Sequence, residues 1–280
     1  MKILQLLVNG LLLGSVYAMV GLGMAMIFGI IGLTNLAHGE YVVLGAYLST
    51  FFARIMGVDP ILTLVVTVPF MFLMGVVLQH VLINRAMKQG GEPALLVTFG
   101  LSIILQDAML MIFSADAQHA STPYSTRTLH IAGLNIAFLD VVLFFICLAC
   151  VLGLTLFLRT TYTGRAIRAI SDDPTAAALV GINARRIYDV ALGVALATAA
   201  VSGLCVGMKW TFYPSSGGQY LLIAFIVVVI GGMDSIPGTL LAGFGFGLAQ
   251  VVGGAKYGLL ISYVVMLITL AIHPKKQIGK

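Results

Sequence analysis

Three polar side chains stand close together in an otherwise apolar part of the chain, within Gly32-Leu-Thr-Asn-Leu-Ala-His-Gly-Glu-Tyr41. Asn35, His38 and Glu40 could hydrogen-bond a solute or relay protons. Such groups are costly at membrane depth unless they line a cavity or pair internally. A plain turn at the membrane interface is the alternative, and composition alone does not separate the two readings.

A second polar break, Gly231-Gly-Met-Asp-Ser-Ile-Pro-Gly238, also lies between two apolar runs. Paired breaks of this kind are typical of transporters in which broken helices direct backbone dipoles at the substrate. We therefore expect a translocation path or gate. Its candidate residues are Asn35, His38, Gly39 and Glu40 in the first break, and Gly231, Gly232, Asp234, Ser235, Pro237 and Gly238 in the second.

The longest polar stretch, Arg159 to Arg186, has the signals of two short helices that meet at a turn. Asp173 can accept a hydrogen bond as N-cap, and Pro174 suits the first helical position because its missing amide would be unpaired there. Gly181 offers the left-handed position that ends the second helix. A capped hairpin with arginines on both sides is a docking element, so we expect a soluble partner to bind it.

The elements that position these residues must be membrane helices. The chain has 60% hydrophobic and 9% charged residues and a mean hydropathy of +1.07, whereas about 25% charged residues is usual in soluble domains. A bilayer core of about 30 Å needs about 20 apolar residues per helix, which allows about eight or nine membrane segments. The net charge of +5 indicates cationic cytoplasmic loops rather than binding to nucleic acid.

The sequence therefore predicts an all-α, polytopic transmembrane bundle, some of whose segments are broken or re-entrant. Residues 1–280 are expected to form a single permease domain whose cytoplasmic coupling hairpin spans about 159–186. The segment Tyr41 to Gly57 is short for a full span, and a fifth apolar segment is expected from Leu134 to Leu158. If the hairpin is cytoplasmic, the polar connection of residues 114–133 lies outside and the lysine tail inside.

Three motifs carry a family resemblance: Asn35-Leu-Ala-His-Gly-Glu40, Gly164-Arg-Ala…Asp173-Pro…Gly181-Ile-Asn183, and Gly231-Gly-Met-Asp-Ser-Ile-Pro-Gly238. With them the chain resembles the permease subunits of branched-chain amino acid (leucine, isoleucine, valine) ABC importers, and more closely their H-type permease. The resemblance covers nearly the whole chain. It implies that the hairpin supplies coupling helices for an ATPase groove, through Gly164, Arg165, Arg168, Asp172, Asp173, Pro174, Gly181 and Asn183.

The resemblance also implies the partners: an M-type permease, two ABC ATPase subunits and a periplasmic substrate-binding protein, assembled in the bacterial inner membrane. No cofactor is expected in this chain, because ATP and magnesium would bind the ATPase. The chain contains no G-x-x-x-x-G-K-[ST] loop that could cradle phosphates, and it is not expected to be an enzyme by itself.

Because the sequence departs from the family pattern at some positions, the resemblance does not identify the substrate. Asp234 stands where the family commonly has glycine, and it could pair with a substrate ammonium group, with Lys256 or with a neighbouring subunit. Similar permeases also carry urea, short-chain amides and aromatic acids. A different class remains as the rival: an ion-coupled secondary transporter in which His38, Glu40 and Asp107 relay protons. An autonomous carrier, however, would have no need of a capped docking hairpin.

Overall fold

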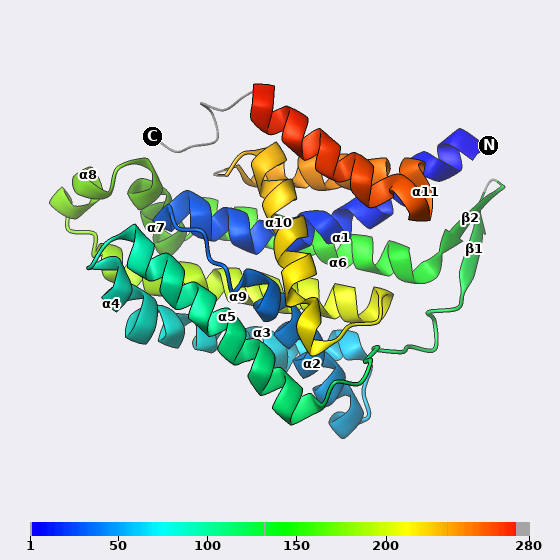
Figure 1. Ribbon diagram of the computed structural model, residues 1–280, viewed down its shortest axis with the longest axis horizontal. Helices are drawn as coiled ribbons and strands as arrows, with labels where there is room; N and C mark the ends of the chain where they lie inside the picture. The colour runs from blue at the N-terminus through cyan, green and yellow to red at the C-terminus, as the bar shows by residue number, and fades with distance from the viewer. Residues whose placement is uncertain (1, 132, 234, 273–280) are drawn as a thin grey trace.

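The computed structural model describes residues 2–131, 133–233 and 235–272, which form a bundle of long helices (Figure 1). Within these residues seven helical segments are long and apolar enough to cross a membrane. They are Ile3–Ile31, Pro60–Met87, Gly91–Phe113, Phe138–Thr160, Ala184–Lys209, Pro214–Gly231 and Ile236–Gly254. The expected polytopic all-α bundle is therefore confirmed, but the described residues hold seven membrane-length segments where about eight or nine were expected.

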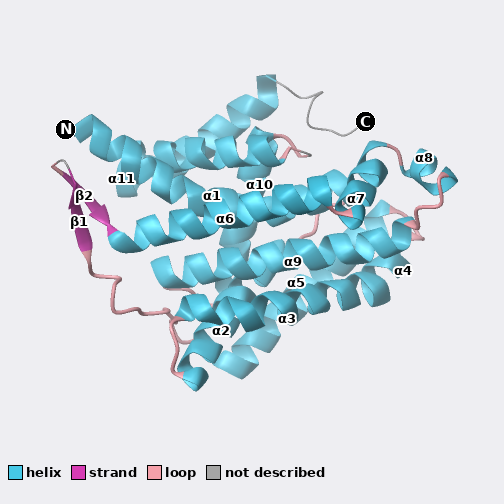
Figure 2. Ribbon diagram, turned by 180° about the vertical axis from the view of Figure 1, so that it is seen from behind, coloured by secondary structure: helices cyan, strands magenta, loops and turns pink. Residues whose placement is uncertain are grey.

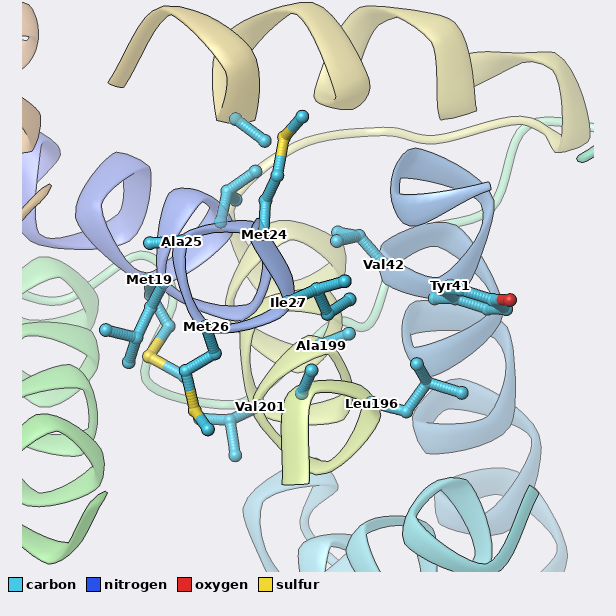
Figure 3. Packing of buried hydrophobic residues seen from close by; sticks show 14 of the residues in the cluster. Met19, Met24, Ala25, Met26, Ile27, Tyr41, Val42, Leu196, Ala199 and Val201 are labelled. Carbon is cyan, nitrogen blue, oxygen red and sulfur yellow. The ribbon is translucent and has the colours of Figure 1, made fainter. Parts of the chain in front are cut away.

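The centre of the bundle is formed by α1 (Lys2–Ile31), α2 (His38–Met56), α9 (Ala184–Lys209) and α10 (Gly217–Gly231). Figure 3 shows the packing of α1 side chains such as Met26 and Ile27 against Ala199 and Leu196 of α9 and Val42 of α2. Most of α1 and α9 is buried. The buried parts of these helices surround the inner polar segment and hold it in place.

Glycines allow a close helix crossing between α1 and α11 (Ile236–Ile272). A Cβ on Gly14 would lie 2.6 Å from the Cα of Phe244, and one on Gly10 would lie 2.6 Å from the side chain of Leu248. Lipid gives apolar side chains little reason to associate, so such backbone proximity provides the packing energy. At Gly254 (φ 61°) α11 kinks and its last part turns back.

The periphery carries large apolar side chains toward the surroundings. It comprises a short 3-10 turn (Pro60–Thr63), α3 (Leu64–Leu78), a π-helical turn (Gln79–Ile83), α4 (Asn84–Met87), α5 (Gly91–Phe113) and α6 (Phe138–Thr160). Val65, Leu96, Met111 and Leu156 are among the exposed residues on these helices. An exposed apolar surface of this extent is what a lipid environment requires.

The connection after α5 differs from the expectation at one point. Residues Thr128–Ile131 (β1) and Leu134–Ala137 (β2) form an antiparallel hairpin, with Thr128 opposite Ala137 and Ile131 opposite Leu134. The expected start of the fifth helix at Leu134 is therefore wrong, since α6 begins at Phe138. Leu134-Asn-Ile-Ala extends the apolar run, but its backbone bonds across to β1 instead of along a helix.

The two ends of the bundle carry different elements. The hairpin of α7 (Tyr162–Asp172) and α8 (Pro174–Leu179) projects at one end, whereas β1 and β2 lie at the other (Figures 1 and 2). A short 3-10 turn, Pro214–Ser216, precedes α10. The hairpin and the strands are thus separated by the length of the membrane helices.

Candidate translocation and coupling sites

The first polar break forms a buried cluster at the beginning of α2. Asn35, His38 and Glu40 are 1%, 0% and 5% exposed. Gly32 (φ 69°) ends α1, and the Asn35 side chain accepts a hydrogen bond from the backbone N–H of Ala37 (3.0 Å). This local hydrogen bond turns the chain so that a new helix can begin at His38.

The cluster lies deep within the bundle. The ring nitrogen Nε2 of His38 is 2.9 Å from the carbonyl oxygen of Val20. Val20 precedes the end of α1 by about three turns, which is roughly 16 Å along a helix axis. After α1 ends, the chain therefore returns into the bundle before α2 starts, as expected for a re-entrant segment.

The helix that meets this segment is α10. A methyl group on Gly39 would overlap the carbonyl oxygen of Gly217, and a Cβ on Gly217 would lie 2.5 Å from Oε1 of Glu40. The N-termini of α2 and α10 thus meet inside the bundle, with the carboxyl group of Glu40 beside both. A helix N-terminus carries partial positive charge, which favours an acidic side chain there.

Sequence reasoning missed the importance of Gly217. The run Pro214-Ser-Ser-Gly-Gly218 was the available signal, because a proline and two glycines interrupt the apolar pattern just before α10. The break is easily overlooked, because its neighbours Trp210 and Tyr213 are residue types that are typical of a membrane interface. In the structure the carbonyl oxygen of Gly217 lies so close to Gly39 that residue 39 cannot carry a side chain.

The second predicted break forms a tight turn elsewhere in the molecule. A methyl group on Gly238 would overlap the carbonyl oxygen of Gly231, and Gly232 has a left-handed φ of 93°. Oγ of Ser235 accepts a hydrogen bond from the N–H of Gly238 (3.0 Å) at the start of α11. Asp234 lies outside the described residues.

Residues of this turn lie beside the hairpin rather than beside Glu40. Ser235 and Pro237 line a cavity of about 460 Å³ between the end of α1, the end of α6 and α7. Arg159, Arg168 and Ser171 line it as well. The structure thus places part of the predicted path next to the predicted coupling element, and it puts Asn35, His38 and Glu40 in a separate position.

The hairpin has the caps that its sequence predicts. The Asp173 side chain accepts hydrogen bonds from the backbone N–H groups of Thr175 (2.8 Å) and Ala176 (3.0 Å), and Pro174 is the first residue of α8. Gly181 follows α8 with a left-handed φ of 84°. The Asn183 side chain accepts from the N–H of Arg186 (3.3 Å) and so caps α9.

Close contacts fasten α7 to the membrane helices. A methyl group on Gly164 would overlap the carbonyl oxygen of Phe157, so α7 lies directly on the end of α6. The Ser171 hydroxyl donates to the carbonyl oxygen of Gly29 at the end of α1. The Arg165 guanidinium donates to the carbonyl oxygen of Thr160 (2.9 Å), one of the carbonyls left unpaired where α6 ends.

Arg168 and Asp172 are exposed, and so is the tip of the hairpin. Leu179 and Val180 are 85% and 77% exposed, although both are apolar. Sequence reasoning did not include these two residues among the contacts of the coupling hairpin, because an apolar end is ordinary for a short amphipathic helix. A projecting, capped helix with an apolar tip is suited to insertion into a groove of another protein.

A polar cluster, buried except at His80, joins the segment after the hairpin to its neighbours. The Asp189 carboxylate of α9 accepts a hydrogen bond from the Asn84 side chain (2.6 Å) and lies 2.9 Å from the His80 ring. Gln79 in turn donates to Asn84 (3.0 Å). Sequence reasoning did not connect these residues, since 105 positions separate Asn84 from Asp189.

Membrane-length helices around a re-entrant polar segment define a multi-pass membrane protein of the transporter class. Residues 6–272 match the family described as the branched-chain amino acid transport system, permease component. The chain belongs to this family and is a permease, that is, a transport component rather than an enzyme.

Known relatives match over nearly their full length. The chain is 30% identical to the high-affinity branched-chain amino acid transport system permease protein BraD of Pseudomonas aeruginosa over 304 residues, covering 99% of this chain and 96% of the relative. It is 29% identical to the LivH permease of Salmonella typhimurium over 296 residues, with the same coverage of 99% and 96%. The corresponding LivH of Escherichia coli is 28% identical.

Proposed function

We propose that this chain forms the membrane pathway of an ATP-driven importer for branched-chain or related amino acids. In this proposal it works in the bacterial inner membrane with an M-type permease, two ABC ATPase subunits and a periplasmic binding protein that delivers the substrate. The hairpin of residues 159–186 and the C-terminus face the cytoplasm. ATP and magnesium bind the ATPase, and this chain carries no cofactor.

The observation that carries the proposal is the α7–α8 hairpin. Its tip is apolar and exposed at Leu179 and Val180, while its base is fastened to α6 and α1 through Gly164 and Ser171. A movement imposed on the tip would therefore reach the membrane helices. Arg165, Arg168, Asp172 and Asp173 are the proposed polar contacts in this transmission.

Co-purification with the ATPase tests the coupling role. The chain would be isolated from its native membrane, the associated proteins identified and their ATPase activity assayed. We expect Leu179→Asp to abolish recovery of the ATPase, because a charge would have to enter an apolar groove. The matched control is Thr126→Asp, which adds the same charge to an exposed residue of the connection at the opposite end. Equal ATPase recovery with both variants would contradict the docking role.

For the path itself we propose the cluster of Asn35, His38 and Glu40. Two of its atoms are buried without a hydrogen-bond partner in the described part of the chain: His38 Nδ1 and Glu40 Oε2. Buried polar atoms are rarely left unpaired, so contact with water or substrate in another state of the pathway would explain them. Ser235 and the glycines of the second break are proposed to gate the cytoplasmic end.

Replacement of Glu40 tests the path. We expect Glu40→Gln to lower uptake at least about tenfold while the ATPase still co-purifies, because the change removes the charge and preserves the shape. Unchanged uptake in a normally assembled complex would remove Glu40 from this role.

Two alternatives predict different outcomes. A permease of the same family for urea, amides or aromatic acids would assemble with an ATPase but import a different substrate. An ion-coupled carrier would transport in liposomes without any ATPase. The hairpin favours the importer, and Asp107, which the proton relay would need, lies exposed on α5.

A further inference from the structure

A second cavity is lined by residues of β1 and β2. These strands lie at the opposite end of the bundle from the α7–α8 hairpin (Figure 1). The volume of the cavity is about 570 Å³, within the range of roughly 300–1,000 Å³ that is typical of small-molecule sites. Five elements surround it: α1, the β-hairpin, α6, α9 and α11. None of its residues belongs to the proposed path or to the coupling hairpin.

An ion pair lies in the wall of this cavity. The Lys209 ammonium group at the end of α9 contacts the Asp140 carboxylate in the first turn of α6. Each charge is at the helix end that its sign favours. The two side chains remain 16% and 23% exposed, and both line the cavity.

The remaining wall combines apolar surface with amide groups. Tyr17 stacks on Trp210 with a centroid distance of 5.8 Å, and Leu13 and Val251 add aliphatic surface. The Oε1 atom of Gln250 is buried and has no hydrogen-bond partner among the described residues. A buried amide oxygen without a donor is what a ligand with N–H groups would satisfy.

We propose that this cavity binds a free aliphatic amino acid as a zwitterion. The ligand's ammonium group would bind Asp140 and Gln250, its carboxylate would bind Lys209, and its side chain would lie against Leu13 and Val251. An adjacent pair of opposite charges matches a zwitterion, because both of its charged groups then gain a partner of opposite sign. The proposal rests on the amino-acid transport function above and assigns a receiving site at the β-hairpin end.

The chain's single tryptophan is Trp210, which lines this cavity. Its fluorescence in the purified full-length chain, reconstituted in lipid nanodiscs, therefore reports on the site directly. Leucine would be compared with isocaproate, which lacks the ammonium group, and with isopentylamine, which lacks the carboxylate. We expect a saturable change with leucine and at least about tenfold weaker binding of both analogues, since each loses one charge-assisted contact.

Variants separate recognition from a purely structural ion pair. We expect Asp140→Asn, which keeps the side-chain shape, to weaken leucine binding at least about tenfold. Arg54→Gln is the control: it removes a cation, hydrogen-bonded to Gln118 (2.7 Å), that does not line the cavity. That variant should bind leucine as the unmodified chain does.

Two results would overturn the proposal: no fluorescence response to leucine at millimolar concentrations, or equal responses to leucine and both analogues. Both are measured on the unmodified chain, so they do not depend on whether a variant folds. If the Trp210 fluorescence did not change with leucine, although the complex of this chain imports leucine, the proposed site would be refuted and the proposed transport function would be supported. A selective response in a chain that binds no ATPase would support the site and contradict the importer.

Discussion

At the scale of single residues, the contact between the two helix N-termini depends on glycine. Gly39 lets α2 and α10 meet beside Glu40, because a methyl group there would overlap the carbonyl oxygen of Gly217. A Cβ on Gly217 would instead lie 2.5 Å from Oε1 of Glu40, so a larger residue there would displace the Glu40 carboxyl group. The polar cluster is therefore positioned by the absence of side chains as much as by the polar residues themselves.

This contact yields a prediction for a pair of glycine variants. We expect Gly39→Ala to destabilise the protein by about 1–3 kcal/mol, the usual cost of overpacking, and to reduce uptake, because the added methyl group would overlap the carbonyl oxygen of Gly217. The matched control is Gly218→Ala, since Gly218 has no atom within 4 Å of an added Cβ. Thermal unfolding in detergent measures both. Equal melting temperatures for the two variants would show that α10 does not pack against α2 in this way.

At the scale of elements, the proposed coupling makes α7 a lever whose base lies against the ends of two membrane helices, α6 and α1. Its inner face, which includes Ile167 and Ile170, is buried, whereas the α8 tip projects. A cavity lined by Arg168, Ser171 and Ser235 lies between this lever and the start of α11. A displaced hairpin would thus move α6 and α1, the two helices that α7 contacts through Gly164 and Ser171.

A substitution at Gly164 tests the contact between α7 and α6. We expect Gly164→Ala to lift α7 from α6 and to uncouple ATP hydrolysis from uptake, because an added methyl group would overlap the Phe157 carbonyl. Gly153→Ala, in α6 itself, adds the same methyl group where nothing lies within 4 Å. The ratio of substrate imported to ATP hydrolysed in proteoliposomes is the measurement. A normal ratio in the Gly164 variant would contradict the lever.

At the scale of the whole molecule, the α7–α8 hairpin and the β-hairpin lie at opposite ends of the bundle (Figure 2). If one hairpin lies on the cytoplasmic side of the membrane, the other must therefore lie on the opposite side. The basic hairpin favours the cytoplasmic side, where positively charged loops accumulate. The proposed amino-acid site would accordingly face the side from which a binding protein delivers substrate.

Cysteine labelling tests this topology. After the native Cys147, Cys150 and Cys205 are replaced by serine, Thr126→Cys should react with an impermeant maleimide from outside spheroplasts, and Thr175→Cys only in inside-out vesicles. Both positions are exposed, so local burial does not hinder the reagent. Labelling of both positions from the same side would contradict the arrangement, and labelling in detergent serves as the control.

Features that depend on neighbouring residues could be predicted from the sequence. The apolar runs predicted the membrane helices because helix length and bilayer thickness are matched locally. The caps at Asp173 and Gly181 were predicted because each is made within a few residues of its helix end. The motifs also indicated the family to which the chain belongs.

The meeting of distant segments, in contrast, emerged only from the folded arrangement. The sequence suggested that the breaks at Gly32 and Gly231 act together, whereas the structure pairs the first break with Gly217 and places Ser235 beside α7. The folded structure likewise places Asp140 in contact with Lys209. Such pairings depend on how whole helices cross and on where backbones can approach, and these are long-range properties that no local pattern of residues encodes.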